Sequence, residues 1–337
     1  MEAGHRVTLK DVAAAAGVST ATVSRVFNDG RYVSPEVRAA VDQAAESLGY
    51  RVNAVARTMR TGRSHGVGYV VSDITNPLFA SIAKGMDQVL HPKGYSLTLA
   101  NSGSDVRHEH EVLESLLERQ VDGVVLSAAQ DDAPGLAQML RRFRASVVLD
   151  RDTEGATDAV VSDHSIGMEQ AVRHLKLLGH THVGLIAGSS RQRGGRRRVE
   201  AFRHAMGSTL DPSLVRSGEF SGETGYRATR ELLGRPDRPT AIIAGSNLIV
   251  VGVLEALGDL GLQVPGDISL ITCDDVDLTR LHQPPIDVID RDTNRLGRTA
   301  VELLLARLEA PNAPFRRKVL PTSFEPRGSS RSLKANA

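Results

Sequence analysis

Residues 8–28 read Thr8-Leu-Lys-Asp-Val-Ala-Ala-Ala-Ala-Gly-Val-Ser-Thr-Ala-Thr-Val-Ser-Arg-Val-Phe-Asn28. This stretch predicts two short helices joined by a tight turn. Thr8 and Asp11 have the spacing of a capping box at the start of the first helix. Gly17 can end that helix because glycine adopts a positive φ without strain, and Ser19 can cap the second helix. Helix, turn and helix at this spacing are typical of a helix-turn-helix, although a plain helical hairpin has the same pattern.

The outward side of the second predicted helix carries small and polar residues and one arginine. Ala21 and Arg25 lie one turn apart on that side. Short side chains let a helix enter the major groove of DNA, where an arginine can donate two hydrogen bonds to guanine. The residues of this unit that we expect at a DNA interface are Thr8, Ser19, Thr20, Ala21, Thr22, Ser24, Arg25 and Asn28.

The N-terminal unit and the linker after it differ in charge. A third predicted helix begins at Ser34-Pro35 and ends at Gly49, which completes an all-α unit over residues 1–50. Residues 51–65 then form a linker, and its arginines have no acid among them up to residue 63. Clustered arginines beside a small helical unit favour phosphate binding, and a solvated linker is the alternative. The short helix-like stretch at 53–60 should order only when something supports it.

From Gly66 onward the pattern changes to apolar strands alternating with helices. Continuous apolar strands of this kind predict parallel sheets that are covered on both faces. The strands are too many for one sheet, so we expect an α/β core of two lobes over residues 66–327. The expected boundaries are about 66–162 with 292–322 for one lobe, about 163–291 for the other, and a disordered tail at 328–337.

Composition excludes several classes of protein. The chain has 337 residues, a net charge of +1 and one cysteine, Cys273, so an intramolecular disulfide is excluded and a reducing cytoplasm is expected. Neither a secretion signal nor a membrane-spanning segment is predicted. We find no nucleophile elbow, phosphate-binding loop or cysteine–histidine ligand set. The sequence therefore predicts no catalysis, cofactor or metal.

Several motifs together resemble one known family over nearly the whole chain. Residues 7–28 look like the DNA-binding headpiece of the lactose-repressor (LacI/GalR) family. The later motifs with the same resemblance are residues 50–59, Asn76-Pro-Leu-Phe79, Val121-Asp-Gly123, Leu178-Gly-His180, Arg238-Pro-Thr-Ala241, residues 264–270 and Cys273-Asp-Asp275. The resemblance implies a helix-turn-helix headpiece, a hinge helix and a core like periplasmic sugar-binding proteins.

The same resemblance implies a function. Members of the family are homodimers that bind double-stranded operator DNA under the control of a small-molecule effector. We therefore expect a repressor that responds to a sugar or sugar derivative. A ligand-responsive activator is the alternative, and a solute-binding protein or an enzyme on the same core is disfavoured. The headpiece argues against the solute-binding protein, and the lack of an acid/base pair or nucleophile argues against the enzyme.

In the family the hinge helix inserts an apolar side chain into the minor groove. That position falls on Met59 here, which would unstack a base step and kink the duplex. Val52 stands where many members have proline, so the entry into the hinge is less restricted. The linker residues expected to contact DNA are Asn53, Ala56, Arg57, Met59 and Arg60.

The family also implies an effector site in the core, at the ends of its strands. Arg198 matches an arginine that holds the effector, Phe220 an aromatic that stacks on it, and Asp274 a carboxylate that accepts from it. Asn247 stands where many members have aspartate. The full set expected at the site is Asp73, Asn76, Phe79, Asp163, Arg196, Arg198, Phe220, Asn247 and Asp274.

Residues 191–198 hold five arginines directly after a predicted strand. The family pattern accounts for Arg196 and Arg198 and leaves the others unexplained. If their side chains border the cavity, its mouth is cationic and an anionic carbohydrate would gain charge-assisted hydrogen bonds. The alternative is that the remaining three face solvent.

Overall fold

The structure is a computed structural model that describes residues 7–27, 33–50, 62–152 and 157–333. The chain divides into two compact units, residues 1–64 and residues 65–337. Each unit is described by itself below.

The first unit contains three short helices around a small apolar core. They are α1 (Leu9–Ala15), α2 (Thr20–Val26) and α3 (Pro35–Ser47). Val12, Val23 and Val41 are fully buried where the helices meet. Gly17 has a φ of +66° in the turn between α1 and α2, which is the conformation that the sequence predicts there. The helix-turn-helix is therefore confirmed.

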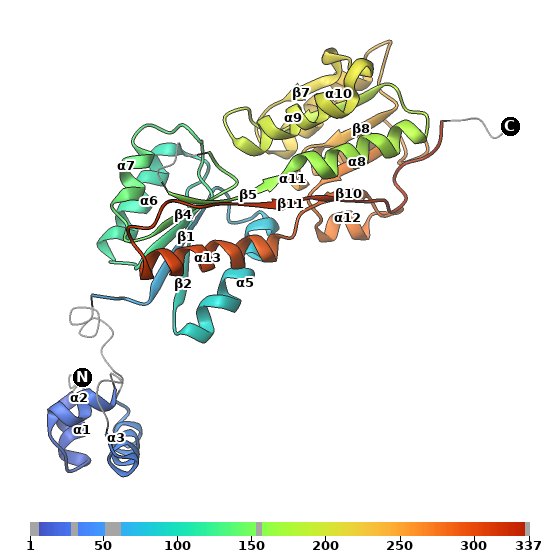
Figure 1. The fold of residues 1–337 in the computed structure, drawn as a ribbon. Helices are drawn as coiled ribbons and strands as arrows, with labels where there is room; N and C mark the ends of the chain where they lie inside the picture. Colours follow the sequence, from blue (N-terminus) through green and yellow to red (C-terminus); the bar gives the residue numbers. More distant parts are fainter. Residues whose placement is uncertain (1–6, 28–32, 51–61, 153–156, 334–337) are drawn as a thin grey trace, which may run out of the picture. The chain divides into compact units, whose positions relative to one another are not determined.

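The second unit has two six-stranded sheets, each the centre of one lobe (Figure 1). Lobe 1 holds the sheet in the order β11-β5-β4-β3-β1-β2, with every neighbouring pair parallel. Its strands are β1 (Gly66–Val71), β2 (Ser96–Asn101), β3 (Gly123–Leu126), β4 (Ser146–Leu149), β5 (Asp158–Asp163) and β11 (Arg317–Pro321).

Helices cover both faces of the lobe 1 sheet. Helices α5 (Pro77–Leu90) and α13 (Thr293–Glu309) lie on one face, and α6 (Val106–Glu118) and α7 (Leu136–Arg141) lie on the other. Helices α5 and α13 come so close that a Cβ on Gly85 would lie 2.1 Å from the backbone oxygen of Asn294. Glycine there permits the contact that keeps α13 on this lobe.

Lobe 2 holds the second sheet, in the order β12-β10-β9-β8-β6-β7. Only the edge strand β12 runs antiparallel to its neighbour. The strands are β6 (Val183–Ala187), β7 (Val215–Ser217), β8 (Ala241–Ala244), β9 (Ser269–Cys273), β10 (Asp287–Asp290) and β12 (Ser323–Glu325). The helices are α8 (His164–Leu177) and α9 (Arg193–Met206) on one face, α10 (Gly222–Leu233) and α11 (Asn247–Asp259) on the other, and α12 (Asp277–Leu281).

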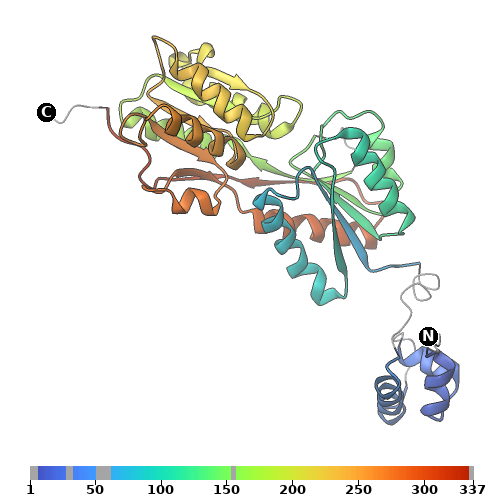
Figure 2. The ribbon, with the colours of Figure 1, turned by 180° about the vertical axis from the view of Figure 1, so that it is seen from behind.

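The chain passes between the lobes after β5, after β10 and after β11, as Figure 2 shows from behind. This arrangement confirms the two-lobed, largely parallel α/β fold that the sequence predicts. It also brings the carboxyl ends of strands from both lobes toward one another, and ligands bind at those ends in parallel sheets. Within the described residues, no helix combines the length and apolar character needed to cross a bilayer.

The end of the chain corrects one expectation. A disordered tail is expected from Gly328 onward, but residues 328–333 are bound to lobe 2. Ser329 is fully buried, its backbone N–H donates to Asp287, and the Leu333 N–H donates to the Leu178 carbonyl at 2.8 Å. The polar composition suggested fraying because sequence alone does not reveal the buried Asp287 carboxylate that receives the Ser329 N–H. Residues 334–337 lie outside the described part of the chain.

Candidate functional site

The outward face of α2 carries the residues expected to contact DNA. Thr20, Ala21 and Arg25 are exposed. Ser19 caps the helix, because its hydroxyl accepts the Thr22 backbone N–H at 3.1 Å. The opposite face is buried in the headpiece core, so the polar face is free to meet a groove.

Other residues expected at the DNA interface differ in how far the structure describes them. Thr8 and Ser24 are described: Thr8 is exposed and donates its hydroxyl to Asp11 at 2.7 Å, and Ser24 is half-buried on α2. Those that lie outside the described residues are Asn28, Asn53, Ala56, Arg57, Met59 and Arg60. Their contacts with DNA stay predictions.

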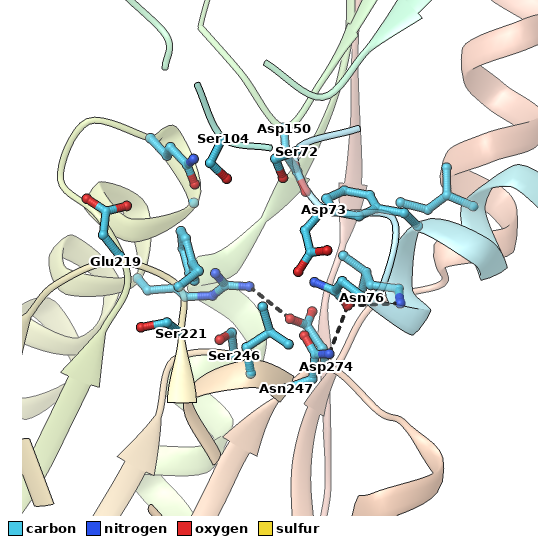
Figure 3. A pocket seen from close by; sticks show the side chains of 18 of the residues that line it. Ser72, Asp73, Asn76, Ser104, Asp150, Glu219, Ser221, Ser246, Asn247 and Asp274 are labelled. Atoms are coloured by element: carbon cyan, nitrogen blue, oxygen red, sulfur yellow. Dashed lines mark hydrogen bonds and ion pairs between the residues drawn. The ribbon is translucent and has the colours of Figure 1, made fainter. Parts of the chain in front are cut away.

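The second unit has a cavity of about 270 Å³ between its two lobes (Figure 3). Its walls come from the segments that follow β1, β2 and β4 in lobe 1 and β6, β7, β8, β9 and β10 in lobe 2, as a parallel fold requires. Of the expected effector residues, the structure brings these to the cavity: Asp73, Asn76, Phe79, Arg198, Phe220, Asn247 and Asp274.

One hydrogen bond joins the lobes at the edge of the cavity. The Asn247 side-chain amide donates to Asn76 Oδ1 at 2.9 Å, and the same oxygen accepts the Leu78 backbone N–H at 3.1 Å (Figure 3). Asn76 therefore caps α5 in lobe 1 and receives the first residue of α11 in lobe 2. An aspartate at position 247 would have no proton to donate here at neutral pH.

The apolar part of the wall includes two phenylalanines, one from each lobe. Phe79 comes from α5 and Phe220 from the loop after β7. The ring of Phe220 packs so closely on Gly188 that a Cβ there would lie 2.0 Å from a ring carbon. The Arg198 guanidinium carbon lies 5.5 Å from the Phe220 ring centroid, within the range of a cation–π contact. Both rings offer apolar surface to a ligand in the cavity.

Arg198 and Asp274 form the buried polar centre of the cavity. Arg198 Nη2 lies 3.5 Å from Asp274 Oδ2, and both side chains are almost fully buried. Arg198 Nε has no hydrogen-bond partner among the described residues. Asp274 has a φ of +73°, which costs energy for a side chain other than glycine and often marks a functional position. The pair can donate to and accept from one hydroxylated ligand.

Four charged residues in the wall were not anticipated, namely Asp150, Arg151, Glu219 and Arg291. The Arg291 guanidinium bridges Asp150 of lobe 1 and Asp274 of lobe 2. Burial opposes the ionisation of Asp150, but the Arg291 guanidinium holds the pKa of that carboxyl well below its usual range. For Asp150, Arg151 and Arg291 the signal was present in the sequence, because they come at or directly after the end of a predicted strand.

Two expected effector residues lie elsewhere. Asp163 caps α8, where its carboxylate accepts the Ser165 backbone N–H at 2.9 Å, so it is absent from the cavity wall. Arg196 donates to Asp131 at 2.7 Å and to Asp152 at 3.1 Å. Residues of a helix advance by about 100° each, so the side chain two positions before Arg198 points in another direction.

The arginine run also corrects the expectation of a cationic mouth. Of residues 191–198, only Gln192, Gly194 and Arg198 line the cavity. Arg193 turns away and donates to the Ser162 carbonyl at 2.9 Å, and Arg197 pairs with Glu200 on the surface. The cavity wall holds four acids and three arginines. The acids are Asp73, Asp150, Glu219 and Asp274, and the arginines are Arg151, Arg198 and Arg291. The wall therefore has no excess of positive charge.

Comparison with known families gives one match in each of the two units of the chain. Residues 8–53 match the model of bacterial regulatory proteins of the lacI family. Residues 172–330 match the periplasmic binding protein-like domain.

Known proteins resemble the chain as a whole. It is similar to the ribose operon repressor of Escherichia coli strain K12, with 33% identity over 329 residues, 96% of this chain and 99% of the relative. It is similar in structure to the Lac repressor dimer bound to operator and the anti-inducer ONPF, with a TM-score of 0.87, 27% identity and coverage of 97% of this chain and 100% of that one. It also resembles a LacI family regulator from Enterococcus faecium with bound ribose, with a TM-score of 0.71, 29% identity and coverage of 80% and 100%. Because a third of the aligned residues are shared with a repressor almost from end to end, the chain belongs to the lacI family of bacterial regulatory proteins.

Proposed function

We propose that this protein is a dimeric, cytoplasmic repressor that binds operator DNA with its headpiece and is controlled by a neutral monosaccharide in the cavity between the lobes. The observation that carries the proposal is the joint presence of an outward polar α2 and a cavity with buried polar side chains in one chain. A regulator needs both, whereas a solute-binding protein or an enzyme has no use for the headpiece.

The DNA-binding half of the proposal rests on the exposed face of α2. Arg25 is the residue there that can read a guanine through two hydrogen bonds, and Ala21 one turn earlier leaves room for the helix to approach. Met59 in the linker would act as the minor-groove wedge, so we expect a near-palindromic operator with a flexible pyrimidine–purine step, CG by family resemblance, at its centre. The similar Lac repressor is a dimer on operator DNA.

The effector half rests on the chemistry of the cavity. A sugar hydroxyl both donates and accepts, so it matches a wall that offers the donors of Arg198 and the acceptors of Asp274. Phe79 and Phe220 suit the apolar faces of a sugar ring. The volume of about 270 Å³ is near the small end for ligand sites, roughly 300–1,000 Å³, and favours a single ring. Ribose is the ligand of one similar regulator, so it is the first sugar to test.

The test measures DNA binding and sugar binding on the same protein. Fluorescence anisotropy with DNA from upstream of the gene should give a specific complex, and D-ribose or another aldose should change its affinity. A fall in affinity indicates induction, and a rise indicates co-repression. The absence of a specific complex under all conditions would overturn the DNA half, and the absence of any response across a panel of aldopentoses and aldohexoses would overturn the effector half.

Two variants test the DNA-binding half and the effector half of the proposal separately. Arg25→Ala should lose discrimination at one base of each half-site, roughly 1–3 kcal/mol, and still bind the sugar. Asp274→Asn should lose the sugar response and still bind DNA. The controls are Arg227→Ala and Asp277→Asn, which change exposed residues of α10 and α12 that do not line the cavity.

A further inference from the structure

Arg291 stands where the chain crosses from β10 of lobe 2 to α13 of lobe 1. Its Nε donates to Asp274 Oδ1 at 2.7 Å, and its Nη1 pairs with Asp150 Oδ2. Asp150 follows β4 of lobe 1, whereas Asp274 follows β9 of lobe 2. One guanidinium thus joins the two lobes through two carboxylates, and we call this group the Asp150–Arg291–Asp274 triad.

The triad is buried and conformationally restricted. The Arg291 side chain is 11% exposed, and those of Asp150 and Asp274 are 12% and 3% exposed. Both aspartates have a positive φ, +49° and +73°, which side chains other than glycine adopt only at an energetic cost. The fold therefore maintains two strained residues in order to present both carboxylates to the same guanidinium.

Electrostatics explains why the guanidinium is needed. Two ionised carboxylates that approach each other in a poorly solvated cavity repel, and each loses hydration. Other cations contribute less: Arg193 Nη1 lies 4.0 Å from Asp150, and Arg198 Nη2 lies 3.5 Å from Asp274. Neither of these contacts joins one carboxylate to the other, so neither can replace Arg291.

We propose that Arg291 is a positioning residue of the effector site, which holds the lobes closed by placing one positive charge between the carboxylates of Asp150 and Asp274. This inference rests on the proposed function in that the cavity binds the effector. Arg291 is shared by both carboxylates, and Arg193 and Arg198 lie beside one carboxylate each, so the protein itself compensates their charge and the ligand need not carry a positive charge. The triad thereby selects a neutral polyol and leaves oxygen lone pairs of Asp274 to accept its hydroxyls.

Chemical rescue tests the charge directly. Arg291→Ala in the full-length protein should lower the melting temperature and weaken D-ribose binding, by about tenfold or more if the closed state becomes a minor one. Millimolar guanidinium chloride should restore part of both losses in this variant. Urea has nearly the same shape without the charge, so it should restore neither the melting temperature nor ribose binding. Sodium chloride should restore neither of them either. Arg196→Ala, which removes a more exposed contact between the lobes, should not respond to guanidinium.

A pH profile separates the charge from simple packing. Asp150 faces Arg291, Arg193 and the buried His164, whose pKa burial lowers well below its ordinary value, and Arg151 follows it in sequence. In Arg291→Gln the pKa of Asp150 should rise above its value in the unfolded chain, because burial opposes ionisation and the Arg291 charge no longer offsets it. Ionising this carboxyl should then cost stability. The difference in melting temperature between the wild type and Arg291→Gln should therefore widen from about pH 4 to pH 7.

The outcomes distinguish the two proposals. If guanidinium does no more than urea and the melting difference does not change with pH, Arg291 only fills space and the inference is wrong. If guanidinium restores the melting temperature of Arg291→Ala but neither the wild type nor the variant binds any sugar, the triad holds the lobes and the sugar effector is wrong. A wild type that binds ribose beside an Arg291→Ala variant of equal affinity would overturn the positioning role.

Discussion

Two buried arginines of this protein make similar ion pairs in different settings. Arg307 on α13 donates to both oxygens of Asp158, at 2.9 Å and 3.1 Å, and all of its partners belong to lobe 1. Arg291 pairs with Asp150 of one lobe and Asp274 of the other. The further acceptors around Arg307 are backbone carbonyls, those of Pro311, Ala313 and Pro314.

The comparison shows that the surroundings of a buried ion pair determine its structural role. The donors of Arg307 are filled by one carboxylate and a ring of carbonyls, and its guanidinium lies 4.8 Å from the Phe315 ring centroid. Such a group has one favourable arrangement and fixes the segment after α13. Arg291 instead pairs with carboxylates on two different lobes, so its ion pairs depend on the distance between the lobes. The following predictions test this distinction between saturated and shared buried charges.

The largest effect should come from breaking the saturated pair. Arg307→Met leaves Asp158 buried without its main partner, so we expect the free energy of unfolding to fall by roughly 3–5 kcal/mol in urea titrations. The control is Arg316→Met, since Arg316 lies 3.9 Å from the same carboxylate but is 42% exposed. That change should cost less than about 1 kcal/mol. Equal losses in the two variants would show that burial does not set the strength of the pair.

A smaller loss of stability is expected at a buried carboxylate whose hydrogen-bond partners do not include an arginine side chain. Asp287 Oδ1 accepts the backbone N–H groups of Arg327 at 2.6 Å and Gly328 at 2.8 Å. Asp287→Asn should cost roughly 2–3 kcal/mol, because the amide replaces an ionised acceptor. Hydrogen exchange of residues 327–330 should accelerate as these bonds weaken. The control Asp267→Asn changes a carboxylate that accepts one exposed backbone N–H, and exchange at 327–330 should not respond to it.

The smallest change in stability should come from replacing a buried carboxylate that has few hydrogen-bond partners. Glu109 on α6 is fully buried, accepts the Ala129 N–H at 2.6 Å, and burial raises its pKa to about 7. Since the folded state keeps the proton to a higher pH than the unfolded state, this group lowers stability as the pH rises from about 4.5 to 7. Relative to Glu109→Gln, the wild type should lose roughly 2 kcal/mol between pH 5 and pH 8. Glu111→Gln, an exposed change on the same helix, should leave the pH dependence of melting unaltered.

Much of this molecule could be predicted from its sequence. Gly17 and Ser19 determine a local turn, so the helix-turn-helix follows from neighbouring residues. The apolar runs predict the strands, and the rule that ligands meet strand ends brings Asn76 and Asp274 to one cavity. These predictions succeed because each depends on a short segment or on a general property of parallel sheets.

The remaining features depend on contacts between distant segments. Arg196 was expected in the cavity because its neighbours match a family motif, yet Asp131 and Asp152 draw it away. Arg291 escaped notice because its partners are far away in sequence. Residues 328–333 likewise carry no sequence signal of order, because their partner Asp287 is distant in the sequence. Pairing between buried charges needs the tertiary structure, since a sequence does not state which aspartate meets which arginine.

The order in which the parts of the chain can fold during synthesis follows from one feature of the fold. Strands β11 and β12 are separated by Thr322 alone, and they complete the edges of the two sheets. The face of lobe 1 under α13 also stays open until residue 309 has been made. Neither lobe can therefore finish folding before almost the entire chain has left the ribosome, whereas the headpiece uses only local contacts and can fold early. During synthesis the DNA-reading helix precedes the completed regulatory core, so a truncated chain would retain a headpiece with no complete effector site to govern it.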